Sequence, residues 1–119
     1  MSTKLQFINL AYLELMSDGD EDMKQTMIDM LLEELPTEME KMALLIQEEN
    51  WAELREVSHK MKSTLAFVGN PTLTDTNQRI EDISKSENGL AELPTLMAKL
   101  AATYPHALAE LEQVRTGTV

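Results

Sequence analysis

Apolar residues recur at the spacing of an α-helix in four long stretches of this sequence, and that periodicity constrains the fold most. Short polar connections separate the stretches. Only four glycines and four prolines occur among 119 residues, and helix-favouring Leu, Met, Glu, Lys and Ala dominate. We therefore expect an all-α protein: an antiparallel four-helix bundle with an additional short N-terminal helix.

The first two helices are expected on either side of a turn at residues 17–20. A short helix over residues 3–16 would have the inward stripe Leu5, Ile8, Tyr12 and Leu15. The second helix would start near Asp20, with the inward residues Met23, Met27, Met30, Leu31 and Leu35. Proline normally ends or kinks a helix. Apolar residues nevertheless stay in phase beyond Pro36, so one long helix, kinked at Pro36 and reaching about Glu49, is predicted.

Capping residues bound the remaining helices. Asn50, with Glu53 three residues later, has the pattern of a capping box and predicts a third helix over residues 51–68. Gly69 would end that helix in a left-handed conformation. A fourth helix is expected over residues 72–86, and a last helix, kinked at Pro105, precedes a frayed tail at 115–119. Residues 1–119 are expected to form a single domain.

The charge balance argues against two classes of partner. With 21 acidic and 10 basic residues, the formal net charge is −11. Binding to nucleic acid or to an anionic membrane depends on clustered positive charge, so neither is expected. The chain has no cysteine, which excludes disulfides and thiolate metal sites. No stretch resembles a signal peptide or a membrane span, and a cytoplasmic location is expected.

Residues 57–74 contain no acidic residue at all. Uniform scatter of the acids would place roughly three in this window. Successive residues of a helix are about 100° apart. The inward stripe of this helix is Leu54, Val57, Met61, Leu65 and Val68. His59 then lies about 140° from the centre of that stripe, on the outward face.

The surroundings of His59 suit a reactive group. Ala52, Ser63 and Ala66 are small neighbours, Glu56 shares the face, and Arg55 and Lys62 lie on its flank. A neutral imidazole is a nucleophile near pH 7, and a nearby lysine attracts anions. Phe67 also lies off the stripe, and it either packs on a neighbouring helix or contacts a partner. An ordinary surface histidine is the alternative interpretation.

A metal site is not expected. Glu56 and His59 form a Glu-x-x-His pair, but di-iron bundles use two such pairs, pointing inward, plus two more carboxylates. His106, which follows Pro105, is expected to be a surface or helix-end residue. No Gly-rich nucleotide loop is present. Lys60 stands where the phosphoacceptor helix of a sensor kinase typically has an acid. We therefore expect no kinase activity.

The pattern His59-x-x-Lys62, with Gly69 ending the helix, resembles the motif of the histidine-containing phosphotransfer (Hpt) domain. The acidic helix start at residues 18–21, the Asn50-Trp51 start and two helices after the motif also match that family, so the resemblance covers nearly the whole chain. One position departs from it: Ser63 stands where the family usually has glycine.

The resemblance implies that His59 accepts a phosphoryl group from a receiver-domain phospho-aspartate and passes it to another receiver, while Lys62 neutralises its charge. The expected partners are receiver domains of response regulators and of a hybrid sensor kinase. They would bring the Mg²⁺, so the chain would be a monomeric carrier without a cofactor of its own rather than a self-sufficient enzyme.

The expected partner-binding residues are Ala52, Arg55, Glu56, Ser63, Ala66 and Phe67. Two residues of the fourth helix, Gln78 and Glu81, are possible contacts of the His59 ring. The competing hypothesis is a non-catalytic helical adaptor, in which His59 is incidental and the bundle only docks a partner.

Overall fold

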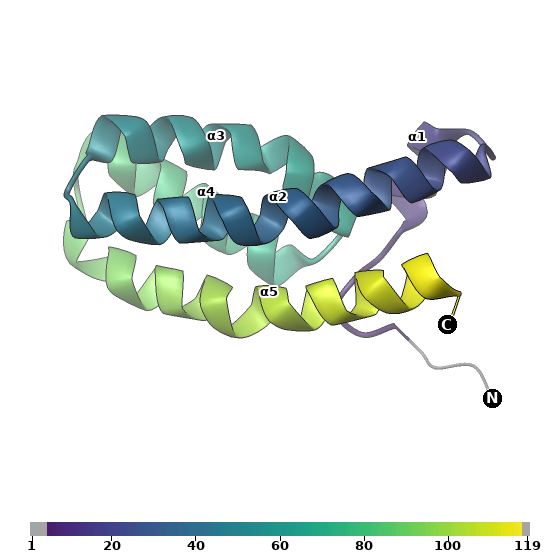
Figure 1. Ribbon diagram of the computed structural model, residues 1–119. Coiled ribbons are helices and arrows are strands. Elements are labelled where there is room, and N and C mark those ends of the chain that lie inside the picture. The colour runs from purple at the N-terminus through teal and green to yellow at the C-terminus, as the bar shows by residue number, and fades with distance from the viewer. Residues whose placement is uncertain (1–4, 118–119) are drawn as a thin grey trace.

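Four long helices form an antiparallel bundle with a short helix, α1, at one end (Figure 1). The computed structural model describes residues 5–117. Its elements are α1 (Ala11–Ser17), α2 (Glu21–Gln47), α3 (Trp51–Val68), α4 (Pro71–Ser86), the 3₁₀ turn η1 (Leu90–Glu92) and α5 (Leu93–Thr116). The predicted fold class is confirmed.

The packing order places α3 and α5 on opposite corners of the bundle. Helix α3 packs against α2 and α4, and α5 packs against the same two helices. The predicted inward stripe of α3 is confirmed, because all five of its members are buried: Leu54, Val57, Met61, Leu65 and Val68. Of the residues between them on α3, Ser58 is also buried, and His59, Lys60, Lys62 and Ser63 are exposed.

The two helices with a proline in their interior are continuous, as predicted. Helix α2 runs through Pro36 and α5 runs through Pro105. The predicted inward orientation of two α2 residues is wrong: Met23 and Met30 are exposed, and Ile28 is buried instead. Met30 lies about 100° round the helix from the buried Leu31, so its side chain leaves the core face.

The predicted residues cap both ends of α3, but the capping box is only half formed, because the backbone N–H of Asn50 donates to the carbonyl oxygen of Leu45 and the Glu53 side chain pairs with Lys41. Asn50 Oδ1 accepts the backbone N–H of Glu53 at 3.3 Å. Gly69 ends the helix with φ at +72°, a left-handed conformation that glycine adopts without steric cost. Asn70 then caps α4 by accepting the N–H of Leu73 at 3.2 Å. These local signals fix the helix that carries His59.

The predicted N-terminal helix over residues 3–16 is wrong in both extent and phase. Helix α1 begins only at Ala11, residues 5–10 are not helical, and residues 3–4 lie outside the described part of the chain. Leu13 is the fully buried residue of α1, whereas Tyr12 and Leu15, expected to face inward, are 45% and 71% exposed.

Contacts with the rest of the bundle explain the shorter helix. The backbone N–H of Asn9 donates to the carbonyl oxygen of Val68 at 2.9 Å. The side-chain amide of Asn70 donates to the carbonyl oxygen of Phe7 at 2.9 Å. Backbone groups that bond to distant parts of the chain cannot also form the internal ladder of a helix.

The C-terminal end is more ordered than predicted. Helix α5 continues to Thr116, so Arg115 and Thr116 are helical rather than frayed, and Gly117 is the C-cap. Arg115 forms an ion pair with Glu112 one turn earlier, which stabilises this end. Residues 118–119 lie outside the described range. Within residues 5–117, no helix is long and apolar enough to cross a membrane.

Candidate functional site

His59 projects from the middle of α3, with 69% of its side chain exposed. The predicted exposure of this residue is confirmed. Its neighbour Ser58 is fully buried and faces α4. Of these two adjacent residues, Ser58 therefore packs against the bundle, and His59 is exposed to solvent.

Ser58 fixes the register of α3 against α4 through Asn77. Ser58 Oγ lies 2.8 Å from Asn77 Oδ1 and 3.0 Å from its carbonyl oxygen. The Asn77 side-chain amide donates in return to the carbonyl oxygen of Ser58 at 2.9 Å. Buried polar groups that bond reciprocally hold one arrangement of the two helices. This register decides which residues of α4 lie beside His59.

The residue brought to His59 is Glu81 of α4, which is only 7% exposed. Its Oε2 lies 2.6 Å from Nδ1 of His59. Its Oε1 lies 2.7 Å from Nζ of Lys62 and accepts a hydrogen bond from Nε2 of Gln78 at 3.1 Å. Both carboxylate oxygens therefore have partners, which is what a nearly buried charge requires.

These partners favour the ionised carboxylate. The hydrogen bond from Lys62 lowers the pKa of Glu81 most, burial acts in the opposite direction, and the bonds from His59 and Gln78 lower it further. The net pKa lies below the ordinary value, so Glu81 is ionised at neutral pH and can only accept hydrogen bonds. Nδ1 of His59 must then carry the hydrogen, which leaves the lone pair of a neutral ring on Nε2.

Of the two possible ring contacts, Glu81 touches the ring. Gln78 instead donates to Glu81 and to Asp82, so it acts on His59 only through the carboxylate. The acid-free window of residues 57–74 therefore does not produce acid-free surroundings. Helix α4 places a carboxylate against the histidine from outside that window.

The expected partner-binding residues fall into two groups. Ala52, Arg55, Glu56 and Ser63 are exposed, whereas Ala66 and Phe67 are half-buried. The ring of Phe67 stacks on that of Tyr12, with the centroids 5.2 Å apart. Phe67 therefore packs between α3 and α1, and because it is only half-buried, contact with a partner stays a prediction beside this packing role.

The apolar surface on α1 was not predicted from the sequence. Tyr12, Leu15 and Met16 are all exposed, and Tyr12 adjoins α3 through its stack on Phe67. The periodicity of residues 3–16 placed Tyr12 and Leu15 inward because it assumed one continuous helix. In the structure Leu13 and Ser17 form the buried side of α1, which leaves Tyr12 and Leu15 facing solvent.

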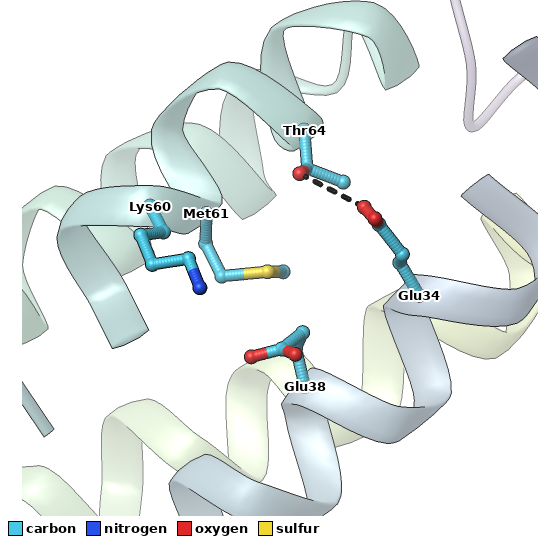
Figure 2. Close-up of a pocket in the computed structure, with 5 residues that line it drawn as sticks. All are labelled: Glu34, Glu38, Lys60, Met61 and Thr64. Atoms are coloured by element: carbon cyan, nitrogen blue, oxygen red, sulfur yellow. Dashed lines mark hydrogen bonds between the residues drawn. The ribbon is translucent and has the colours of Figure 1, made fainter. Parts of the chain in front are cut away.

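A cleft of about 160 Å³ lies between α2 and α3, on the flank of α3 that carries Lys60 (Figure 2). Glu34 and Glu38 line it from α2, and Lys60, Met61 and Thr64 line it from α3. Thr64 Oγ1 lies 3.5 Å from Glu34 Oε2. The described residues contain no cluster of three or more potential metal ligands, here or elsewhere.

The fold and the site define a class of protein: a helical bundle that displays an oriented histidine from the middle of one helix. The model of the Hpt domain family matches residues 26–117, and the chain belongs to that family. The Hpt domain is the phosphotransfer module of two-component phosphorelays, in which it interacts with receiver domains. The resemblance noted in the sequence is thus confirmed.

A solved structure has the same fold as this chain. The chain is similar to the HPT domain of an Hpt sensor hybrid histidine kinase from Shewanella, with 21% sequence identity and a TM-score of 0.72. The match covers 96% of this chain and 97% of that one. Comparison with curated protein sequences gives no match.

Proposed function

We propose that His59 is the phosphoacceptor of this Hpt domain, taking a phosphoryl group from the phospho-aspartate of one receiver domain and passing it to another. One observation carries the proposal. Glu81 binds Nδ1 of a ring that is largely exposed, so the free Nε2 is the nitrogen available to a docked partner. An incidental surface histidine would not need a nearly buried carboxylate to orient it.

The proposed reaction needs no proton transfer to or from this chain. The lone pair on Nε2 forms a bond to phosphorus while the bond from phosphorus to the aspartate oxygen breaks, and the aspartate leaves as a carboxylate. The phosphorylated ring keeps its hydrogen on Nδ1 and gains positive charge, which Glu81 stabilises. In the second step, an aspartate carboxylate attacks phosphorus and the bond to Nε2 breaks.

Lys62 is the proposed source of positive charge for the phosphoryl group. Its Nζ lies 2.7 Å from Glu81 Oε1, so it is held on the same side of α3 as the histidine ring. An ammonium group can donate three hydrogen bonds, and it can therefore bind a phosphoryl oxygen while still contacting Glu81. The Mg²⁺ would come with the receiver, and the chain acts as a carrier rather than as a kinase.

The proposed docking surface for the receiver surrounds His59. It includes Ala52, Arg55, Glu56, Ser63, Ala66 and Phe67, and we extend it to the exposed apolar residues of α1: Tyr12, Leu15 and Met16. The small side chains at Ala52 and Ser63 allow close approach to the ring. The apolar residues of α1 provide surface that loses water when a partner docks. Within this proposal the protein is monomeric and cytoplasmic.

A transfer assay tests the proposal against a purely adaptor role. The protein is incubated with a receiver domain that carries a radioactive phospho-aspartate, and the label on the Hpt chain is characterised. We expect an acid-labile, alkali-stable label on the native protein and none on His59→Gln. An unlabelled native protein, or an equally labelled variant, would show that His59 is not the acceptor.

A further inference from the structure

The non-helical segment before α1 is fastened to α5 by the side chain of Glu110. Oε1 of Glu110 accepts the backbone N–H of Phe7 at 2.8 Å and that of Ile8 at 3.2 Å. The N–H of Gln6 lies 3.0 Å from both oxygens of the same carboxylate. Three consecutive backbone donors thus converge on one side chain, and we call this arrangement the Glu110 clasp.

Two further contacts hold the same segment. The ring of Phe7 stacks on His106 of α5, with the centroids 4.6 Å apart. On the other side, Asn70 at the start of α4 donates to the carbonyl oxygen of Phe7 at 2.9 Å. Residues 6–8 are therefore held between α5 and the start of α4, immediately before α1. His106 is exposed, as expected, and its ring also helps to hold Phe7 against α5.

The clasp decides where α1 lies, because α1 follows it after two residues. Helix α1 packs on α2 and α3, and its Tyr12 stacks on Phe67. In Figure 1 the N-terminal segment passes the C-terminal half of α5 before it reaches α1. A helix of seven residues is too short to be stable alone, so its position depends on such contacts.

We propose that Glu110 is a remote positioning residue for receiver binding: it fixes the N-terminal segment and thereby holds the apolar face of α1 beside the His59 surface. The proposal rests on the proposed function and adds a residue that no partner docked on α3 would touch. Glu110 lies on α5, and α5 occupies the corner of the bundle opposite α3. The hydrogen bonds of Glu110 go to residues 6–8, so we assign its effect on receiver binding to the N-terminal segment and α1.

The test separates docking from chemistry by using two measurements. The first is the Kd for a receiver domain that the native protein binds, obtained by titration. The second is the rate at which phosphoramidate, a small phosphodonor that needs no docking surface, labels His59. We expect Glu110→Ala to raise the Kd about tenfold, as loss of a well-packed part of an interface does. The labelling rate should stay within twofold of native, because α3, α4 and Glu81 are untouched.

Two control variants make the comparison specific. Glu110→Gln retains a side-chain oxygen that can accept the N–H groups of residues 6–8, so it should restore most of the affinity. Glu112→Ala removes the same charge two residues further along α5; it breaks the ion pair with Arg115 but leaves the clasp intact, so its Kd should be native. An equal rise in Kd for Glu112→Ala would overturn the proposal in favour of a general charge effect.

A second variant opens the clasp from the other side. Asn70→Asp keeps an oxygen to cap α4 but replaces the donor to Phe7 with an acceptor, so it should weaken receiver binding in the same way. Hydrogen exchange at the amides of residues 6–8 reports the opening directly and should quicken in Asn70→Asp and in Glu110→Ala. Faster exchange with a native Kd, or unchanged exchange in Glu110→Ala, overturns the inference. Failure of phosphoramidate to label His59 in the native protein would count instead against the proposed function.

Discussion

Nδ1 of His59 and Oε2 of Glu81 lie 2.6 Å apart, and this contact joins an exposed ring on α3 to a nearly buried carboxylate on α4. Because Glu81 is ionised at neutral pH, the contact assigns the ring hydrogen to Nδ1. The same carboxylate binds Lys62, so one residue orients both groups that we place at the phosphoryl group.

Replacing Glu81 should therefore slow transfer without removing the acceptor. Glu81→Ala is expected to lower the single-turnover rate of transfer by about ten- to a hundredfold, since a hydrogen bond to a charged group is worth roughly 1.5–3 kcal/mol. Glu81→Gln should be less impaired, because its amide oxygen can still accept the Nδ1 hydrogen. A native rate in Glu81→Ala would show that orientation of the ring is unimportant.

The lowered pKa of Glu81 also predicts how stability depends on pH. The folded protein binds this proton more weakly than the unfolded chain, so the ionised carboxylate stabilises the fold. That contribution is fully present above the unfolded pKa of about 4.3 and is lost as the pH falls through the lower folded value.

Denaturant unfolding of the native protein and of Glu81→Gln between pH 7 and pH 3 measures this contribution. The difference in unfolding free energy, about 1–2 kcal/mol at pH 7, should stay constant to about pH 5 and shrink below about pH 4. A difference that grows on acidification would contradict the assignment of a lowered pKa to Glu81.

Lys62 should matter mainly for the rate of transfer: its removal leaves Glu81 with one partner fewer and costs some stability, but it should not unfold the bundle. Lys62→Ala is expected to slow transfer about tenfold, the equivalent of roughly 1.4 kcal/mol, because the phosphoryl group loses a charge-assisted hydrogen bond. Lys60→Ala is the matched control, since Lys60 lies on the same helix but lines the cleft facing α2 (Figure 2). Equal slowing by both variants would indicate a general effect of net charge, and unfolding of Lys62→Ala would assign that residue a structural role.

The helices from Asn50 onward could be predicted well because their limits depend on neighbouring residues. Asn50 and Gly69 act on the backbone within one turn, and the buried stripe of α3 needs only the helical repeat. The N-terminal segment could not be predicted in this way. Its conformation depends on Glu110, about a hundred positions further along the chain, and no local pattern signals that contact.

In the candidate site, too, features set by one helix could be predicted, and features set by contacts between helices could not. The exposure of His59 follows from the phase of one helix, and Lys62 follows one turn later. Glu81 could be named only as a possible contact, because its place depends on the register of α4 against α3. Ser58 and Asn77 fix that register by buried hydrogen bonds that periodicity does not reveal. The tautomer of the His59 ring also depends on this register, because the register places Glu81 beside Nδ1.

Gly69 should be the most sensitive glycine of the chain. It has φ at +72°, and a Cβ placed there would lie 2.2 Å from the carbonyl oxygen of Asn9. Gly69→Ala therefore combines backbone strain with a clash against the N-terminal segment, and we expect a loss of more than about 2 kcal/mol. Gly19 has φ at +78° and no atom within 4 Å of such a Cβ, so Gly19→Ala should cost only about 1 kcal/mol.

Thermal or denaturant unfolding of both glycine variants checks this prediction. The Gly69→Ala variant should also show faster hydrogen exchange at residues 6–10, because the added methyl group pushes against Asn9. Equal losses of stability in the two variants would mean that the contact between Gly69 and Asn9 contributes nothing beyond the left-handed conformation itself.

The position of the phosphoryl group on the His59 ring shows whether Glu81 orients the ring for transfer. The protein is phosphorylated by a receiver phospho-aspartate, and ¹⁵N and ³¹P NMR then identify the ring nitrogen that is bonded to phosphorus. The contact between Nδ1 and Glu81 predicts phosphorus on Nε2, with the hydrogen retained on Nδ1. Phosphorus on Nδ1 would mean that Glu81 does not orient the ring, and phosphorus on another residue would mean that His59 is not the acceptor.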